Sequence, residues 1–200
     1  SYAFASEDGK YVVKFFKFKH LRPSLFHQLL PSIGPLEVYK KKQAMRKERK
    51  LFGVFASYKL AYDVDKEESG LVFIQLNVVG NPKRTLVVYD KLGLFHTIDL
   101  EEVPFIVQKR GVPLRDVLEE LLRQGDLSAA KLRIGRVFDQ YAEEYKKGIY
   151  DHDHGVVRNT GFIGDQPIHL DVGKLYVEPN MKDPEYARKD LLLVAEKIEE

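Results

Sequence analysis

One segment of the chain, residues 150–175, concentrates side chains that bind metal ions or move protons. It reads YDHDHGVVRNTGFIGDQPIHLDVGKL, with Asp, His and Asn residues separated by short apolar runs. Carboxylate and amide oxygens suit a hard cation such as Mg²⁺, whereas imidazoles suit Zn²⁺ or Fe²⁺. The segment therefore allows two kinds of chemistry, that of a catalytic, Mg²⁺-binding loop or that of a transition-metal site.

The transition-metal alternative depends on the triplet His152-Asp153-His154. In an extended segment the two imidazoles would lie on one face of the backbone. The chain has no cysteine and no His-Glu-x-x-His helix, so a third ligand is not evident from the sequence. A polar loop without chemistry is the third interpretation of the same residues.

The composition is that of a globular protein. Apolar residues make up 44% of the 200 residues, charged residues 31%, and the net charge is +2. This charge favours neither a nucleic acid nor an anionic membrane as a partner. A basic run at 40–50 is the local exception, and we interpret it as a solvated helix face rather than a nucleic-acid patch.

The absence of cysteine excludes disulfides, a thiol nucleophile and a cysteine zinc site, and it fits a reducing compartment. No apolar run reaches the length of a membrane span, so we expect no membrane partner and a cytoplasmic location. Because the chain ends inside a helical pattern, we expect it to be part of a longer protein.

The elements that must position the segment are strands first and helices later, which indicates an α+β fold. At 110–113 the composition shifts and strand patterns give way to helical patterns. This shift predicts a boundary between an N-terminal part, 1–110, and a C-terminal part, 111–200. The hydrophobic patterns predict strands at 9–18, 70–79, 84–90, 94–100 and 103–109 and a hairpin formed by 161–164 and 167–170. They also predict a long helix at about 35–66, or two shorter helices broken near Gly53, and helices at 113–125, 127–150 and about 184–199.

The order of these elements resembles the protein-kinase-like superfamily, including its small-molecule and antibiotic kinases. A strand lysine, a long helix, an antiparallel meander, a short connector, a long helix and an acidic loop with Asn follow one another over about residues 2–175. The resemblance implies a two-lobed fold, with an antiparallel sheet and one long helix in the N-lobe and a mainly helical, truncated C-lobe. It also implies ATP and Mg²⁺ as cofactors.

On this resemblance, Lys14 of Tyr11-Val12-Val13-Lys14 would hold the α- and β-phosphates of ATP. Val12 would share its face of the strand, because side chains of a strand alternate. A helix glutamate would orient the lysine, and Glu48 is our choice, with Glu37 as the alternative.

The metal ligands implied are Asn159 and Asp171, an amide and a carboxylate separated by the predicted hairpin. The inter-lobe connector would be FIVQKRG, with Gln108, Lys109 and Arg110 near the adenine edge. The implied reaction is phosphoryl transfer from ATP to a hydroxyl of a protein or small-molecule acceptor.

The chain also departs from the family pattern. His154 stands where the family has its catalytic Asp, with Asp153 one position earlier and Asp151 three positions earlier. We choose Asp153 as the base, with an extra residue accommodated beside Gly155. Valine replaces the phenylalanine of the Asp-Phe-Gly motif, no glycine-rich loop is present, and we expect the family's first strand to lie outside this chain. The alternative function is therefore a pseudokinase or a kinase-like interaction module.

Overall fold

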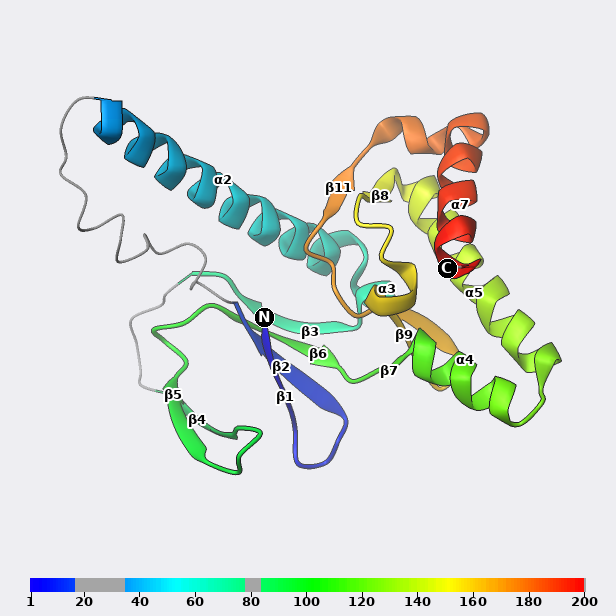
Figure 1. The fold of residues 1–200 in the computed structure, drawn as a ribbon, viewed down its shortest axis with the longest axis horizontal. Coiled ribbons are helices and arrows are strands. Elements are labelled where there is room, and N and C mark those ends of the chain that lie inside the picture. The colour runs from blue at the N-terminus through cyan, green and yellow to red at the C-terminus, as the bar shows by residue number, and fades with distance from the viewer. Residues whose placement is uncertain (17–34, 78–83, 200) are drawn as a thin grey trace.

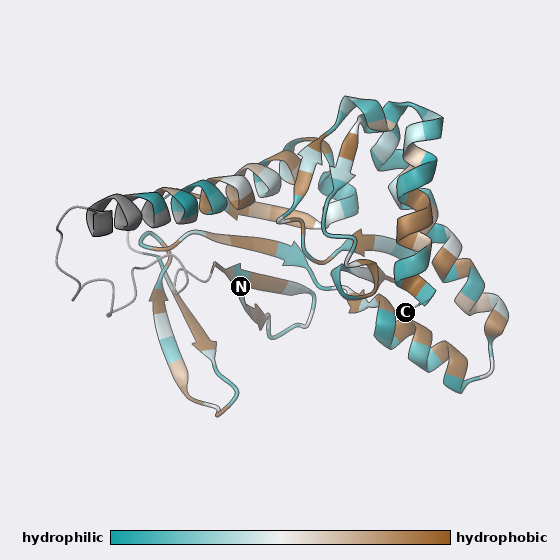
Figure 2. Ribbon diagram, turned by 45° about the horizontal axis from the view of Figure 1, so that its top comes forward, coloured by the Kyte–Doolittle hydropathy of each residue, from teal (hydrophilic) through white to brown (hydrophobic). Residues whose placement is uncertain are grey.

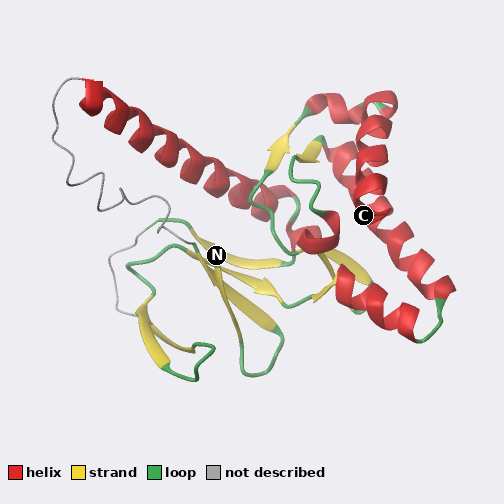
Figure 3. Ribbon diagram, viewed as in Figure 1, coloured by secondary structure: helices red, strands yellow, loops and turns green. Residues whose placement is uncertain are grey.

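The computed structural model describes residues 1–16, 35–77 and 84–199, which form an α+β arrangement (Figure 1). The larger strands and the long helix α2 (Pro35–Val64) lie in one half of the molecule. Most of the other helices lie in the second half, together with short strands (Figure 3). The α+β class predicted from the sequence is therefore confirmed.

The main sheet is antiparallel and has four strands in the order β1-β2-β6-β3. Strand β1 forms a hairpin with β2, and β6 lies between β2 and β3. The register places Val12 opposite Gln108 and Lys14 opposite Ile106. The strands are β1 (Tyr2–Ala5), β2 (Tyr11–Phe15), β3 (Leu71–Gln75) and β6 (Phe105–Lys109).

Apolar residues dominate the strands of the main sheet (Figure 2), and each face of the sheet contributes to a buried cluster. On one face, Tyr58 and Ala61 of α2 pack in a buried cluster with Ile106. On the other face, Phe105 packs with Val88 of a separate hairpin. This hairpin consists of β4 (Thr85–Tyr89) and β5 (Phe95–Asp99).

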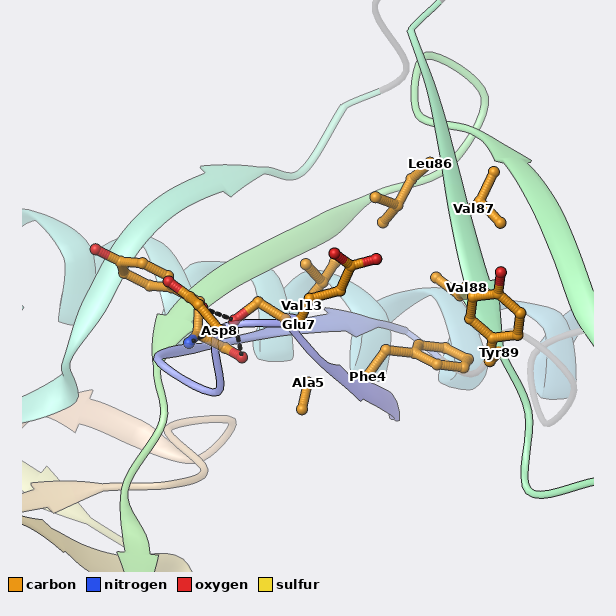
Figure 4. Close-up of a pocket in the computed structure, with 11 residues that line it drawn as sticks. Phe4, Ala5, Glu7, Asp8, Val13, Leu86, Val87, Val88 and Tyr89 are labelled. Carbon is orange, nitrogen blue, oxygen red and sulfur yellow. Dashed lines mark hydrogen bonds between the residues drawn. The ribbon is translucent and has the colours of Figure 1, made fainter. Parts of the chain in front are cut away.

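A cavity of about 580 Å³ lies beside that hairpin, between β4 and the β1–β2 hairpin (Figure 4). Val13 of β2 and Leu86 of β4 are among its lining side chains. None of the site residues predicted from the sequence lines this cavity.

The second half is built around α5 (Leu127–Lys147). This helix begins where the Asp126 carboxylate accepts a hydrogen bond from the Ala129 backbone N–H at 2.9 Å. It ends at Gly148, whose φ of 75° is the left-handed conformation that favours glycine. Around it lie α3 (Lys66–Ser69), α4 (Leu114–Arg123), α6 (Val156–Asn159), α7 (Pro184–Glu199), the 3₁₀ helix η2 (Pro179–Lys182), β7 (Val112–Pro113), β8 (Ile149–Asp151), β9 (Thr160–Ile163), β10 (Gln166–His169) and β11 (Leu175–Val177).

A group of charged side chains links α5 to β10 and to the start of α3. His169 of β10 and Glu144 of α5 form an ion pair of 2.7 Å, and the two side chains are 1% and 0% exposed. Lys147 of α5 pairs with Asp65, at the start of α3, at 2.8 Å. Burial and the nearby Glu144 raise the pKa of Asp65 to about 7.

Most predicted elements are confirmed, including the long helix, which continues through Gly53. The 9–18 strand is shorter than predicted, and residues 17–34 lie outside the described ranges. The predicted meander is wrong, because β6 inserts between β2 and β3 while β4 and β5 pair only with each other among the described strands. Strand propensity identifies strands but does not determine which edges pair. The boundary at 110–113 remains a prediction.

Over the described residues, the structure has no helix with the length and apolar content needed to cross a membrane.

We expect the His169–Glu144 pair to make stability depend on pH. Burial by itself would lower the pKa of His169, but the Glu144 carboxylate raises it to about 9, helped by Asp151 and Asp65. In the unfolded chain the pKa of His169 is about 6.5, so the pair contributes its full stabilisation below about pH 6.5. This contribution is lost as the pH rises through the folded-state pKa of about 9.

Denaturant unfolding at a series of pH values measures this effect. The difference between the folded and unfolded pKa values of His169, about 9 and 6.5, corresponds to at most about 3 kcal/mol in the free energy of unfolding. The free energy of unfolding should therefore fall between pH 7 and 9, and the fall should be much smaller in His169→Gln. An equal fall in both proteins would assign the pH dependence to other groups.

Candidate functional site

A cavity of about 680 Å³, here called the large cavity, opens where the main sheet meets the second half. Val12 and Lys14 of β2 both line it, whereas Val13 lines the cavity on the opposite face, as the alternation of a strand requires. Gln108 and Lys109 line it from β6. Most of the remaining wall is formed by Arg110, Gly111, Val112, Pro113, Asp116 and Leu170.

Lys14 is half-buried and reaches toward the back of the large cavity. Its Nζ donates to Gln108 Oε1 at 2.6 Å and to the backbone oxygen of Leu170. Burial lowers the pKa of Lys14, and the negative charge of Asp171 opposes this effect. The ammonium thus lies between the large cavity and the segment that carries Asp171.

A smaller cavity of about 230 Å³, here called the acidic cavity, contains the carboxylates predicted from the sequence. Asp151, Asp153 and Asp171 all line it, together with Lys174. The two cavities meet at consecutive residues, because Leu170 lines the large cavity and Asp171 the acidic one. Phe16, directly after β2, and Val54 and Tyr58 of α2 are also among the residues that line it.

Asp153 and Asn159 are direct neighbours. The Asn159 Nδ2 group donates to Asp153 Oδ2 at 3.2 Å, and Lys174 Nζ donates to Asp153 Oδ1 at 2.7 Å. Asn159 is also joined to the residue that precedes Asp171, since its backbone oxygen accepts from the Leu170 N–H. Asp153 therefore contacts Asn159 directly and lines the acidic cavity together with Asp171.

Asp171 is held by α2 as well as by its own loop. Its Oδ1 accepts hydrogen bonds from Tyr58 Oη at 3.2 Å and from the Gly173 N–H at 3.0 Å. Burial and the charge of Asp171 raise the pKa of Tyr58 well above its ordinary value, so the phenol stays a donor. Within the described part of the chain no donor contacts Oδ2, which leaves that oxygen for a cation.

Asp151 differs from Asp153 in its burial. Its side chain is 3% exposed, and burial raises its pKa. Oδ1 accepts from the Asp153 N–H at 2.9 Å, whereas the buried Oδ2 has no hydrogen-bond partner among the described residues. Asp151 thus stabilises the loop through its hydrogen bond with the Asp153 backbone, while the Asp153 carboxylate is the more accessible of the two.

The histidines do not converge on one point. His154 Nε2 is hydrogen-bonded to Asp190 Oδ1 of α7 at 2.6 Å, and the backbone of His154 has a φ of 45°. The exposed His152 packs against Tyr150 and Tyr176. Among the described residues no group of three or more His, Cys, Asp or Glu side chains could hold a metal ion. The geometry of the loop favours Asp153 over His154 as the group that faces the acidic cavity.

Glu48 does not contact Lys14 in the structure. Its side chain is exposed on α2, and among the described residues no ion pair joins it to Lys14. The part of α2 that lines the acidic cavity lies one to three turns further along and offers Val54 and Tyr58. The side chain of Glu37, the alternative, lies outside the described residues.

The sequence analysis did not identify Tyr58 or Lys174 as site residues. Tyr58 belongs to an apolar helical stripe, and such a stripe indicates a core position without showing that its hydroxyl meets a carboxylate. Lys174 follows directly after Asp-Val-Gly, and this adjacency to a predicted metal ligand is the signal that was available.

We expect His154 to act mainly in stability. In His154→Asn, the asparagine tolerates the positive φ, but its side chain is too short to reach Asp190. The Asp190 Oδ1 atom then stays buried without this partner. The free energy of unfolding should fall by about 1–3 kcal/mol, measured by denaturant unfolding. The exposed His152→Ala is the control, with a change below about 0.5 kcal/mol. A fully stable His154→Asn protein would contradict this role.

Comparison with known proteins gives no relative for this chain. No protein-family model matches the sequence, and no curated protein matches it. No solved structure matches the fold. The functional interpretation therefore depends on the geometry of the two cavities and on the residues that line them.

Proposed function

We propose that the chain is an ATP- and Mg²⁺-binding phosphotransferase of the kinase-like type. The observation that carries the proposal is the position of Lys14, between a cavity of about 680 Å³ and the Asp171 carboxylate. A cavity of this size accommodates a nucleotide, and an ammonium at its back suits the phosphates. Asp153 lines the acidic cavity together with Asp171, and Asn159 is hydrogen-bonded to Asp153.

The arrangement of elements supports the same proposal. Lys14 lies on a central strand of an antiparallel sheet that has one long helix against one face. A short connector at 110–111 leads from β6 into the helical half, and Arg110 and Gly111 line the large cavity. The acidic loop and the β9–β10 hairpin follow α5, as in the family that the sequence resembles.

The donor set fits Mg²⁺ rather than a softer metal. It consists of the Asp171 carboxylate and the Asn159 side-chain carbonyl, which are hard oxygen ligands. The Asn159 nitrogen donates to Asp153, so its carbonyl oxygen is the atom left for a cation. When bound, Mg²⁺ would supply charge neutralisation on the phosphate oxygens.

In the proposed reaction, the γ-phosphoryl group moves from ATP to an acceptor hydroxyl, and ADP leaves. Asp153 accepts the hydrogen bond of the hydroxyl and takes its proton as the new P–O bond forms. Lys14 holds the α- and β-phosphates. Lys174, 2.7 Å from Asp153, orients that carboxylate and adds positive charge beside the reacting oxygen. The acceptor is a protein or a small molecule.

A second candidate function is a pseudokinase or kinase-like interaction module. One observation favours it: Asp153 is already engaged by Lys174 and Asn159, while His154, at the family's base position, pairs with Asp190. Such a protein would bind nucleotide without transferring phosphate, or would use its surface alone.

MgATP binding is the first test. Because a ligand that binds the native state stabilises it, ATP at millimolar concentration should raise the melting temperature by several degrees when Mg²⁺ is present and less when it is absent. Asp171→Asn should fold normally and lose the Mg²⁺ dependence. Asp139→Asn, exposed on α5 and outside both cavities, is the matched control. The absence of any shift in the unsubstituted protein would refute nucleotide binding.

The base is tested by steady-state kinetics of ADP release. Asp153→Ala should lower kcat by roughly 100-fold or more with little change in KM, because the base acts in the transition state. Asp151→Asn keeps the oxygen that accepts from the Asp153 N–H, and it should retain most of kcat. If every variant binds MgATP and no acceptor is ever phosphorylated, the second candidate function replaces the first.

A further inference from the structure

Gln108 is a buried amide whose polar atoms all have partners. Its side chain is 2% exposed, at the back of the large cavity. Nε2 donates to the backbone oxygens of Ser69 and His169, each at 2.6 Å. Oε1 accepts from Lys14 Nζ, also at 2.6 Å. One side chain thus joins the strand that bears the lysine to the end of α3 and to the end of β10.

These partners allow only one orientation of the amide. A backbone oxygen only accepts hydrogen bonds, and an ammonium only donates them. The two oxygens therefore require the NH₂ group of Gln108, which leaves Oε1 for Lys14. The reversed amide would place oxygen against two oxygens and NH₂ against the ammonium, with three hydrogen bonds lost.

We propose that Gln108 is the positioning residue of Lys14, in the place that a helix glutamate holds in the family the sequence resembles; this rests on the proposed nucleotide site. Among the described side chains no carboxylate forms an ion pair with Lys14, and the nearby face of α2 presents Val54 and Tyr58. Gln108 Oε1 is the side-chain acceptor that Lys14 has there.

A neutral acceptor has a chemical consequence for the site. A glutamate would neutralise the ammonium, whereas an amide oxygen orients it and leaves its full positive charge for the phosphates. The Gln108 amide also bonds the His169 oxygen, and Lys14 bonds the Leu170 oxygen, so both hold the segment that ends in Asp171. The position of the lysine is thereby coupled to the position of the proposed metal ligand.

Two substitutions separate positioning from a purely structural role. Gln108→Met and Gln108→Glu, with its carboxylate ionised, both lose the NH₂ donors to Ser69 and His169, but only the glutamate keeps an acceptor for Lys14. The direct readout is labelling of Lys14 by acetic anhydride at a single pH, located by mass spectrometry. Gln75→Met is the matched control, because Gln75 is a buried glutamine of the same sheet that donates to the Leu100 oxygen.

We expect the Lys14 labelling rate to rise several-fold in Gln108→Met and to stay near the unsubstituted rate in Gln75→Met. In Gln108→Glu it should be no higher than the unsubstituted rate, because the carboxylate favours the protonated amine. MgATP affinity, measured by calorimetry, should fall about tenfold in Gln108→Met, the loss expected for one charge-assisted hydrogen bond. In a Lys14→Met background the same substitution should change affinity very little, since its effect acts through the lysine.

Equal labelling in Gln108→Met and Gln108→Glu would overturn the proposal, as would an affinity loss that persists without Lys14. If the unsubstituted protein binds no MgATP, the proposed function fails, and the labelling rates still decide whether Gln108 positions Lys14. If Gln108→Met does not fold, Gln108→Asn replaces it, because its amide is one methylene shorter and too short for all three partners.

Discussion

The half-buried ammonium of Lys14 is the group around which the two halves of the molecule are joined. A charge removed from water is costly unless it is hydrogen-bonded, so its partners must be held in place. They are Gln108 Oε1 on the neighbouring strand and the Leu170 oxygen just after β10, and the negative charge of Asp171 adds to them. The sheet half and the helical half therefore meet at a charged contact as well as at an apolar one.

The segment at 169–171 is held from several sides. His169 pairs with Glu144 of α5, the Leu170 N–H donates to the Asn159 oxygen, and Asp171 accepts from Tyr58 of α2. These contacts involve both halves, so the Asp171 carboxylate occupies a defined position between the cavities. Preorganisation of this kind allows a carboxylate to bind a cation without first ordering its own loop.

The acidic loop shows how local backbone geometry selects among similar side chains. Asp151 is buried and holds the Asp153 N–H, whereas His154, in a left-handed conformation, pairs with Asp190 on α7. Asp153 remains as the carboxylate beside Asn159 and Lys174. Three candidates that look equivalent in the sequence thus occupy three different environments.

The sequence by itself determined what depends on neighbours along the chain. This includes the α+β class, most strands and helices, and the placement of Val12 and Lys14 on one face of their strand with Val13 on the other. Alternation and helical period are local properties, so they can be read without a fold. The tertiary structure decided what depends on partners far apart in the chain. Gln108 lies 94 residues from Lys14, and Tyr58 lies 113 residues from Asp171. Periodicity assigns a residue to a face but does not specify which distant side chain that face meets, so neither these contacts nor the insertion of β6 between β2 and β3 could be predicted.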